Sequence, residues 1–111
     1  KQLRYPPFCD IILIGVSSKS YKELEETSNK IYESLKAKIH TEKLQILLYK
    51  PVPAPIDRIK NKFRWRIIVK CKLDEKITKS LKNTIEKVEK EIKNTKYETR
   101  INVDVNPSNM L

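Results

Sequence analysis

Glycine is almost missing from this sequence, since Gly15 is the only one among 111 residues. Phosphate-binding loops of the GxxxxGK and GxGxxG types need several glycines, because the backbone must approach the phosphates closely. The sequence contains no such loop. We therefore expect the chain to hydrolyse no nucleotide and to contain no catalytic residue.

Residues that bind metal ions are also few. The cysteines Cys9 and Cys71 lie far apart without a CxxC motif, and His40 is the only histidine. A structural zinc site needs four such ligands. We therefore expect no metal or cofactor, and interpret the cysteines as reduced thiols of a cytoplasmic protein.

Long apolar runs are missing as well, because the longest, residues 11–14, has only the length of a strand. We expect no membrane partner. The sequence also begins without an initiator methionine or a signal-peptide pattern. Residues 1–111 are interpreted as a single domain cut from a longer protein, with a length sufficient to bury one modest core.

Positive charge, in contrast, is abundant and unevenly distributed. The formal net charge is +10, and residues 50–72 hold eight basic residues against one acidic residue, Asp57. The two segments with helical periodicity are nearly balanced in charge. A local excess of basic residues is typical of a surface that binds a polyanion. A solubilising surface without a ligand is the alternative interpretation.

Hydrophobic periodicity predicts four strands and two helices. The strands are expected at 8–16, 44–49, 63–72 and 101–105, and the helices at 21–38 and from a cap at Asp74 to Ile92. Prolines at 51, 53 and 55 predict a semi-rigid loop after the second strand. The order βαββαβ is that of the ferredoxin-like α+β fold, a four-stranded antiparallel sheet with both helices on one face.

The segment 63–72 alternates between apolar and basic residues, with Ile68 as the one apolar residue among the basic positions. Its apolar positions, Trp65 among them, are expected to face the helices, and its basic positions to face the open side together with Arg100. Arginine and lysine suit phosphate groups, and a stiff loop loses little entropy on binding. The residues predicted to bind DNA are Arg58, Lys60, Lys62, Arg64, Arg66, Lys70 and Lys72.

Two smaller features complete the predicted surface. Tyr49 falls on the open side of the second strand and is a candidate for stacking on a base, although a role in anchoring the loop fits equally well. In the first strand Ile11 and Leu13 alternate with Ile12 and Ile14, so one pair must face the open side. We assign Ile11 and Leu13 to docking against the rest of the longer protein.

Four short motifs carry a resemblance to a known family. They are Tyr5-Pro-Pro-Phe8, Pro51-Val-Pro-Ala-Pro55, Lys62-Phe-Arg-Trp-Arg66 and Val103-Asp-Val-Asn-Pro107. In this order and spacing they resemble the C-terminal domain of the PriA family of bacterial replication-restart helicases, over essentially the whole chain. Lys50 and Asn106 depart from the family pattern, which commonly has glycine and aspartate at those positions.

The resemblance implies a fold similar to that of a ribosomal small-subunit protein. It also implies binding of forked or single-stranded DNA, and help in binding the tail of the single-stranded-DNA-binding protein during primosome assembly. The helicase lobes of the same protein would be a further partner. ATP and zinc would be bound by those other regions and not by this chain. The implied location is the bacterial cytoplasm, in association with the nucleoid.

Other functions fit the same topology. An acylphosphatase-like hydrolase needs a glycine-rich anion loop after the first strand, and residues 16–20 contain no glycine. An RNA-binding module of the ribosomal type fits the basic face as well as a DNA-binding domain does, because fold does not determine function. A module that docks an acidic peptide without binding DNA directly is a third alternative.

Overall fold

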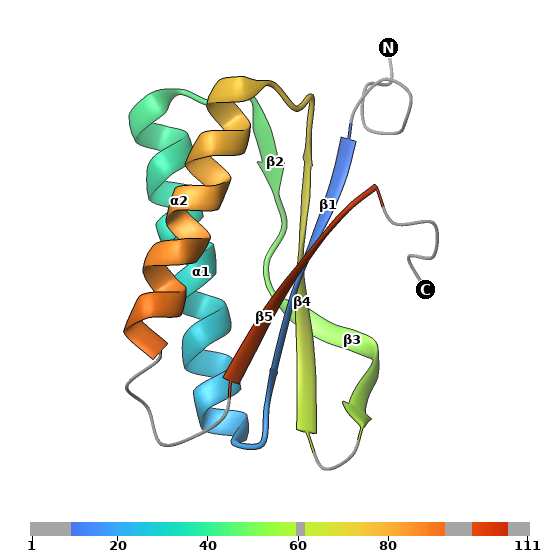
Figure 1. The fold of residues 1–111 in the computed structure, drawn as a ribbon. Helices are drawn as coiled ribbons and strands as arrows, with labels where there is room; N and C mark the ends of the chain where they lie inside the picture. The colour runs from blue at the N-terminus through green and yellow to red at the C-terminus, as the bar shows by residue number, and fades with distance from the viewer. Residues whose placement is uncertain (1–9, 60–61, 93–98, 107–111) are drawn as a thin grey trace.

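The computed structural model describes residues 10–59, 62–92 and 99–106. Two long helices lie side by side on one side of a twisted antiparallel sheet (Figure 1). The helices are α1 (Tyr21–Glu42) and α2 (Glu75–Ile92). The strands are β1 (Asp10–Ser18), β2 (Ile46–Leu48), β3 (Val52–Ile59), β4 (Lys62–Cys71) and β5 (Thr99–Val105).

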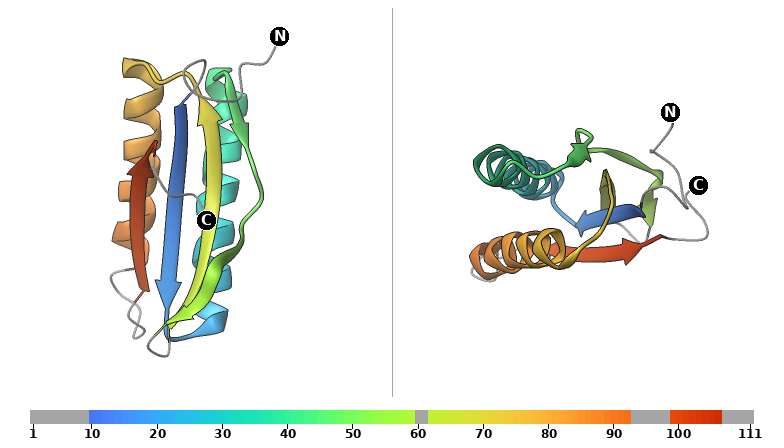
Figure 2. Two further views of the ribbon diagram at one scale, coloured as in Figure 1. Left: turned by 90° about the vertical axis from the view of Figure 1, so that its right-hand side faces the viewer. Right: turned by 90° about the horizontal axis from the view of Figure 1, so that it is seen from above.

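The sheet has the strand order β2-β4-β1-β5, with every described pair antiparallel. Both helices cover the same face, so that the other face points towards the viewer in the left view of Figure 2. These features confirm the predicted ferredoxin-like α+β fold. The central pair β1 and β4 is continuous from Asp10 opposite Cys71 to Ser18 opposite Phe63.

The prediction of four strands with a proline loop was wrong in one respect, because the proline segment forms a fifth strand. β3 pairs with the first half of β4, on the same side as β2, and its register shifts between Pro53 and Arg58. β2 is correspondingly shorter than predicted. Proline is tolerated here because β3 lies at the edge of the sheet, where a missing N–H leaves no partner strand unsatisfied.

The core lies between the helices and the covered face of the sheet. Alternate residues of β1 and β4 point into it, and each helix contributes one apolar stripe. Its buried members are Ile12, Ile14, Val16, Leu24, Ile31, Leu35, Ile67, Val69, Cys71, Ile77, Leu81, Ile85 and Val88. Trp65 and Phe63 are partly buried against this core, as predicted for Trp65, and both meet the ring of Tyr21 edge to face, at 5.7 and 5.4 Å between centroids.

The helix starts agree with their predicted caps. The Ser20 hydroxyl accepts a hydrogen bond from the Glu23 N–H at 3.2 Å, and the Asp74 carboxylate accepts one from the Ile77 N–H at 2.8 Å. α1 continues four residues past its predicted end at 38, to Glu42, and stops at Lys43, which has the left-handed φ of 53°. No glycine marks this C-terminus, and without that signal the helix end could not be located from the sequence.

Asn106 joins the end of β5 to the start of β1. It adopts a φ of 49°, and its N–H donates to the Ile11 carbonyl at 2.6 Å. The Asn106 Oδ1 accepts from the Ile11 N–H at 2.8 Å, and its Nδ2 donates to the Asp10 carboxylate at 2.9 Å. An aspartate at position 106 could not make this last bond, because it has no N–H to donate and two carboxylates would repel.

Asp10 in turn links this junction to the start of α2. Its other carboxylate oxygen accepts a hydrogen bond from the Leu73 N–H at 2.9 Å. The hydrogen bond from Asn106 is the largest cause that lowers the pKa of Asp10, followed by the bond from Leu73 and, more weakly, the charge of Lys72. A carboxyl group with a lowered pKa stabilises the folded state above its unfolded pKa, and this contribution is lost as the pH falls through the folded pKa.

We predict that Asn106→Asp raises the pKa of Asp10, because a donor is replaced by a like charge. The variant should be less stable than the wild type at neutral pH, and the difference should shrink in acid as both carboxyl groups become protonated. NMR titration of Asp10 and urea unfolding at neutral and acidic pH measure the two effects. Asn106→Ala, which removes the donor without adding charge, is the control and should raise the pKa less.

Candidate nucleic-acid interface

The face of the sheet that the helices leave uncovered, here called the open face, is made by the residues that alternate with the core positions. In β1 and β4 these residues pair directly across the strands, and β2 and β5 extend the surface to either side. The open face comprises Ile11, Leu13, Gly15, Ser17, Leu47, Tyr49, Arg64, Arg66, Ile68, Lys70, Arg100, Asn102 and Asp104. Its two halves differ in character.

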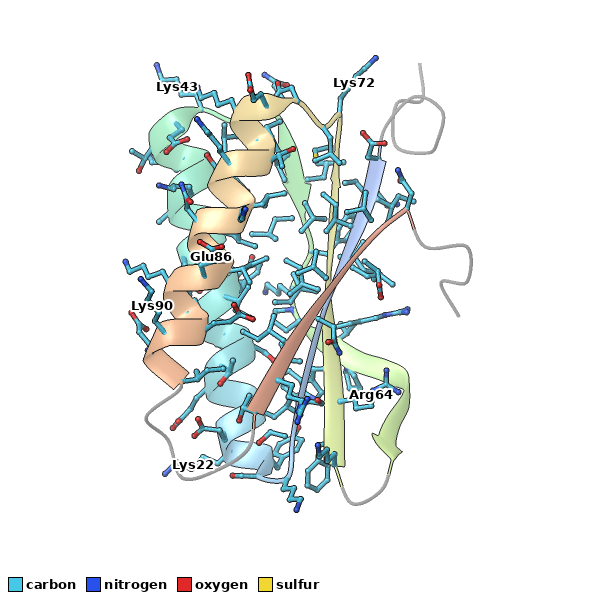
Figure 3. The ribbon with its side chains drawn as sticks, in the orientation of Figure 1. Lys22, Lys43, Arg64, Lys72, Glu86 and Lys90 are labelled. Carbon is cyan, nitrogen blue, oxygen red and sulfur yellow. The ribbon has the colours of Figure 1, made fainter. Side chains whose placement is uncertain are left out.

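One half is basic. Ser17 lies opposite Arg64 on one side and opposite Arg100 on the other, so one cross-strand row holds two arginines. The adjacent row places Arg66 and Asn102 on either side of Gly15. Arg64 and Arg100 are exposed and Arg66 is half-buried; Figure 3 shows Arg64 on the side of the sheet away from the helices. Guanidinium groups on neighbouring strands suit the spaced phosphates of a nucleic-acid backbone.

The other half is apolar, with one lysine in it. Leu13 lies opposite Ile68, and Lys70 lies between Ile11 and Leu47. The Tyr49 N–H continues the pairing beyond β2 by donating to the Ile68 carbonyl at 3.0 Å. Tyr49 is 40% exposed, and the Lys70 Nζ lies 5.3 Å from the centroid of its ring. This cation–π contact holds a positive charge beside an exposed aromatic face.

The structure brings most of the predicted site residues to one surface. Arg64, Arg66 and Lys70 lie on the open face, Lys62 starts β4 on the same side by alternation, and exposed Lys72 directly follows β4. Ile11 and Leu13, and not Ile12 and Ile14, are the pair that faces the open side. Arg58 belongs to β3, opposite Phe63, rather than to a loop. The Arg58 side chain and the whole of Lys60 lie outside the described part of the chain.

The sequence pattern did not show how the members of this surface are arranged across the strands. Alternation placed Arg100 on the open side, but only the pairing of β5 with β1 places it in the row of Arg64. Asn102 and Gly15 carry no charge, and nothing in the sequence distinguished them. The cation-rich row was therefore predictable in β4 and not across the neighbouring strands.

The helical layer carries charge of both signs. Lys30 and Glu91 join α1 to α2 through an ion pair of 2.6 Å, and Lys38 pairs with Glu42 at 3.2 Å. The hydrogen bond from Lys30 lowers the pKa of Glu91, and hydrogen bonds from Ser80 and then Lys38 lower that of Glu42. The outer surface of the helices therefore lacks the positive excess of the 50–72 segment.

Gly15, the only glycine, lies in the middle of β1 rather than in a loop at a helix start. Within the described ranges no group of three or more His, Cys, Asp or Glu residues could hold a metal ion, and Cys9 lies outside them. No helix in the described part of the chain is long and apolar enough to cross a membrane.

A two-helix layer on an antiparallel sheet with a partly basic open face defines an α+β domain of the ferredoxin-like class. The designed protein Foldit4 is similar to this chain in its fold only. The TM-score is 0.53 and the sequence identity 11%, over 86% of this chain and 96% of the designed one.

The sequence comparisons identify the family. The profile of the primosomal protein N C-terminal domain matches residues 1–108, and the chain belongs to this family. The replication restart protein PriA of Bacillus subtilis (strain 168) is 28% identical over 111 residues. That match covers 100% of this chain but only 13% of the relative.

We predict that Gly15→Ala stabilises the fold by about 0.5–1 kcal/mol, the usual difference between alanine and glycine inside a strand. A Cβ at this position would meet its nearest atoms, the Asn102 Cβ and carbonyl oxygen, at 4.0 Å, which is ordinary contact. Urea unfolding measures the change. A destabilised variant would show that packing on the open face requires the glycine.

Proposed function

We propose that this chain is the DNA-binding and docking domain of a replication-restart helicase, and that it contacts DNA through the basic half of the open face. The observation that carries the proposal is the row of Arg64 and Arg100 across three strands, adjacent to Arg66. Membership of the primosomal protein N family supports DNA as the polyanion. Opening of DNA by ATP hydrolysis would belong to the rest of a longer protein.

The contacts we propose are with phosphates rather than with base edges. Arginine and lysine side chains on a flat sheet neutralise a nucleic-acid backbone without reading its sequence. A protein that restarts replication has to act at forks anywhere in a genome, so indifference to sequence suits it. Such binding weakens steeply with salt, because each neutralised phosphate releases counterions.

We predict that reversing Lys62 and Arg64 together to glutamate weakens binding to forked DNA about tenfold or more at low salt, because both cations lie at the start of β4, on the basic half of the open face. All DNA sequences should be affected alike. The slope of log affinity against log salt should flatten by about one unit for each lost contact. Fluorescence anisotropy over a salt series measures both quantities.

The matched control reverses Lys87 and Lys90, two exposed lysines of α2, in the same way. Its total charge is identical, but its changes lie on the helical layer, where Figure 3 shows Lys90. The control should bind nearly as the wild type does. If it loses as much affinity as the Lys62 and Arg64 double variant, the binding surface is not the open face.

In this proposal Tyr49 gives the domain a preference for single-stranded DNA. Its exposed ring offers a stacking surface at the border between the apolar half and the basic half. We predict that Tyr49→Ala weakens binding to single-stranded DNA by about 1–3 kcal/mol, the usual contribution of one stacked base. Binding to fully paired duplex should change little, and Tyr49→Phe should behave as the wild type.

The measurement compares single-stranded and duplex DNA of equal length at one salt concentration, with the melting temperature of each variant. Equal losses on both DNAs, or a lower melting temperature with unchanged affinity, would instead assign Tyr49 to anchoring the connection between β2 and β3.

The apolar half supports the docking part of the proposal. Its combination of Leu47, Ile68 and Leu13 with Lys70 fits an acidic peptide that ends in a hydrophobic residue, the chemistry expected of the tail of the single-stranded-DNA-binding protein. Ile11 and Leu13 equally suit contact with the helicase lobes. Competition between forked DNA and such a peptide at fixed salt ranks the two ligands, and structured RNA of equal length tests the ribosomal-type alternative.

A further inference from the structure

Aromatic side chains gather at the end of the sheet where β4 begins. Phe63 and Trp65 alternate with basic residues along β4, so both rings lie on the side of the helices. Tyr21, the first residue of α1, meets the two rings edge to face, at 5.4 and 5.7 Å between centroids. Although these contacts hold it in place, Tyr21 is 49% exposed. An exposed aromatic ring offers a surface on which a nucleobase can stack.

Hydrogen bonds fix the short connection between β1 and α1 that places Tyr21 beside β4. The Ser20 N–H donates to the Ser18 hydroxyl at 3.2 Å, and the Ser20 hydroxyl accepts from the Glu23 N–H at 3.2 Å. Ser18 is the last residue of β1, and its hydroxyl also accepts a hydrogen bond from the Thr99 hydroxyl at 3.0 Å. The backbone that carries Tyr21 is therefore already ordered, so little entropy is lost when a ligand binds to its ring.

The two segments that meet at this end of the sheet contain cations but no acidic residue. They are residues 17–22, with the sequence Ser-Ser-Lys-Ser-Tyr-Lys, and residues 62–66, with the sequence Lys-Phe-Arg-Trp-Arg. Lys19 and Lys22 lie before and after the exposed tyrosine in the chain, and both are exposed, as is Arg64 of β4. Stacking rings beside a positively charged path are typical of surfaces that bind single-stranded nucleic acid.

The cations at this end lie on both sides of the sheet. Figure 3 shows Arg64 on the open side and Lys22 on the helical side. A polyanion that contacts both residues must turn around the end of the sheet. Duplex DNA is too stiff for so tight a turn, because its persistence length is about 50 nm. An unpaired DNA strand bends easily enough to follow this path.

We propose that an unpaired DNA strand leaves the basic half of the open face, turns around this end of the sheet and stacks one nucleobase on Tyr21. This inference rests on the proposed function, because Arg64 supplies the phosphate contact before the turn. Lys19 and Lys22 contact phosphates after the turn. Tyr49 lies beside the apolar half of the open face, so the two stacking sites are separate. A fork with an unpaired arm consequently binds more tightly than a blunt duplex.

Trp65 provides a direct readout, because it is the only tryptophan of the chain and its ring lies 5.7 Å from that of Tyr21. Titration with a short oligothymidine should quench the tryptophan fluorescence to a plateau. A duplex of equal length, with its binding followed by anisotropy, should leave the fluorescence nearly unchanged, because it stays on the other side of the sheet. Oligothymidine that binds without quenching does not reach Tyr21, and that result would overturn the inference.

Substitutions at Tyr21 separate stacking from packing. Tyr21→Leu keeps an apolar side chain against Phe63 and Trp65 but removes the aromatic face. This variant should bind oligothymidine about fivefold or more weakly, the usual loss for one stacked base. Tyr21→Phe should bind as the wild type does. The melting temperature of each variant shows whether it is folded.

A second double variant leaves the aromatic cluster intact. Reversing Lys19 and Lys22 together to glutamate should weaken oligothymidine binding about tenfold or more at low salt. The matched control reverses Lys79 and Lys82, two exposed lysines of α2, with the same change in total charge. The control should bind oligothymidine nearly as tightly as the wild type does.

The measurements distinguish failure of this inference from failure of the proposed function. A wild type that binds neither oligothymidine nor duplex would contradict both. If the wild type binds DNA, but Tyr21→Leu and the double reversal of Lys19 and Lys22 bind oligothymidine equally well, the DNA contacts are confined to the open face. The proposed function would then stand without the turn around the sheet.

Discussion

The unbroken antiparallel pairing of β1 with β4 is the constraint on which the rest of this structure depends. Nine consecutive residue pairs join the two inner strands without a bulge. Because side chains alternate along each strand, this single register decides for both strands which residues enter the core and which reach the open face. A slip by one residue would expose Ile67 and Val69 and bury Arg64 and Arg66, so core packing and the proposed DNA contacts share one cause.

Much of the fold could be predicted because its signals are local. Helical periodicity, the Ser20 and Asp74 caps and the alternation in 63–72 each report on neighbours along the chain. β3 was missed because proline argues against a strand unless the strand lies at an edge, and edge position is a property of the whole sheet. The end of α1 was missed because Lys43 takes a left-handed conformation without glycine.

The candidate site, like the fold, could be predicted only where the signals are local. The basic positions of β4 follow from the alternation of side chains along one strand. The exposure of Tyr49 follows in the same way, because Tyr49 and its neighbour Leu48 point to opposite faces of the sheet. The row that joins Arg64 to Arg100 depends on two strand pairings at once, and these connect residues far apart in the sequence. Similarly, the choice between Ile11 and Ile12 for the open side required knowledge of where the helices lie. A single sequence does not show which strands pair when they lie far apart along the chain.

The bonds between Asn106 and the start of β1 have a consequence for how the chain acquires its structure. They join residues 95 and 96 positions apart in the sequence. Contacts of such separation form late, because closing a long loop costs entropy before any bond is gained. During synthesis on a ribosome, nearly the whole domain must be translated before β5 can pair with β1. Until then the apolar residues of β1 are covered by β4 and the helices but lack β5 beside them. The nascent domain is therefore most open to aggregation in that interval.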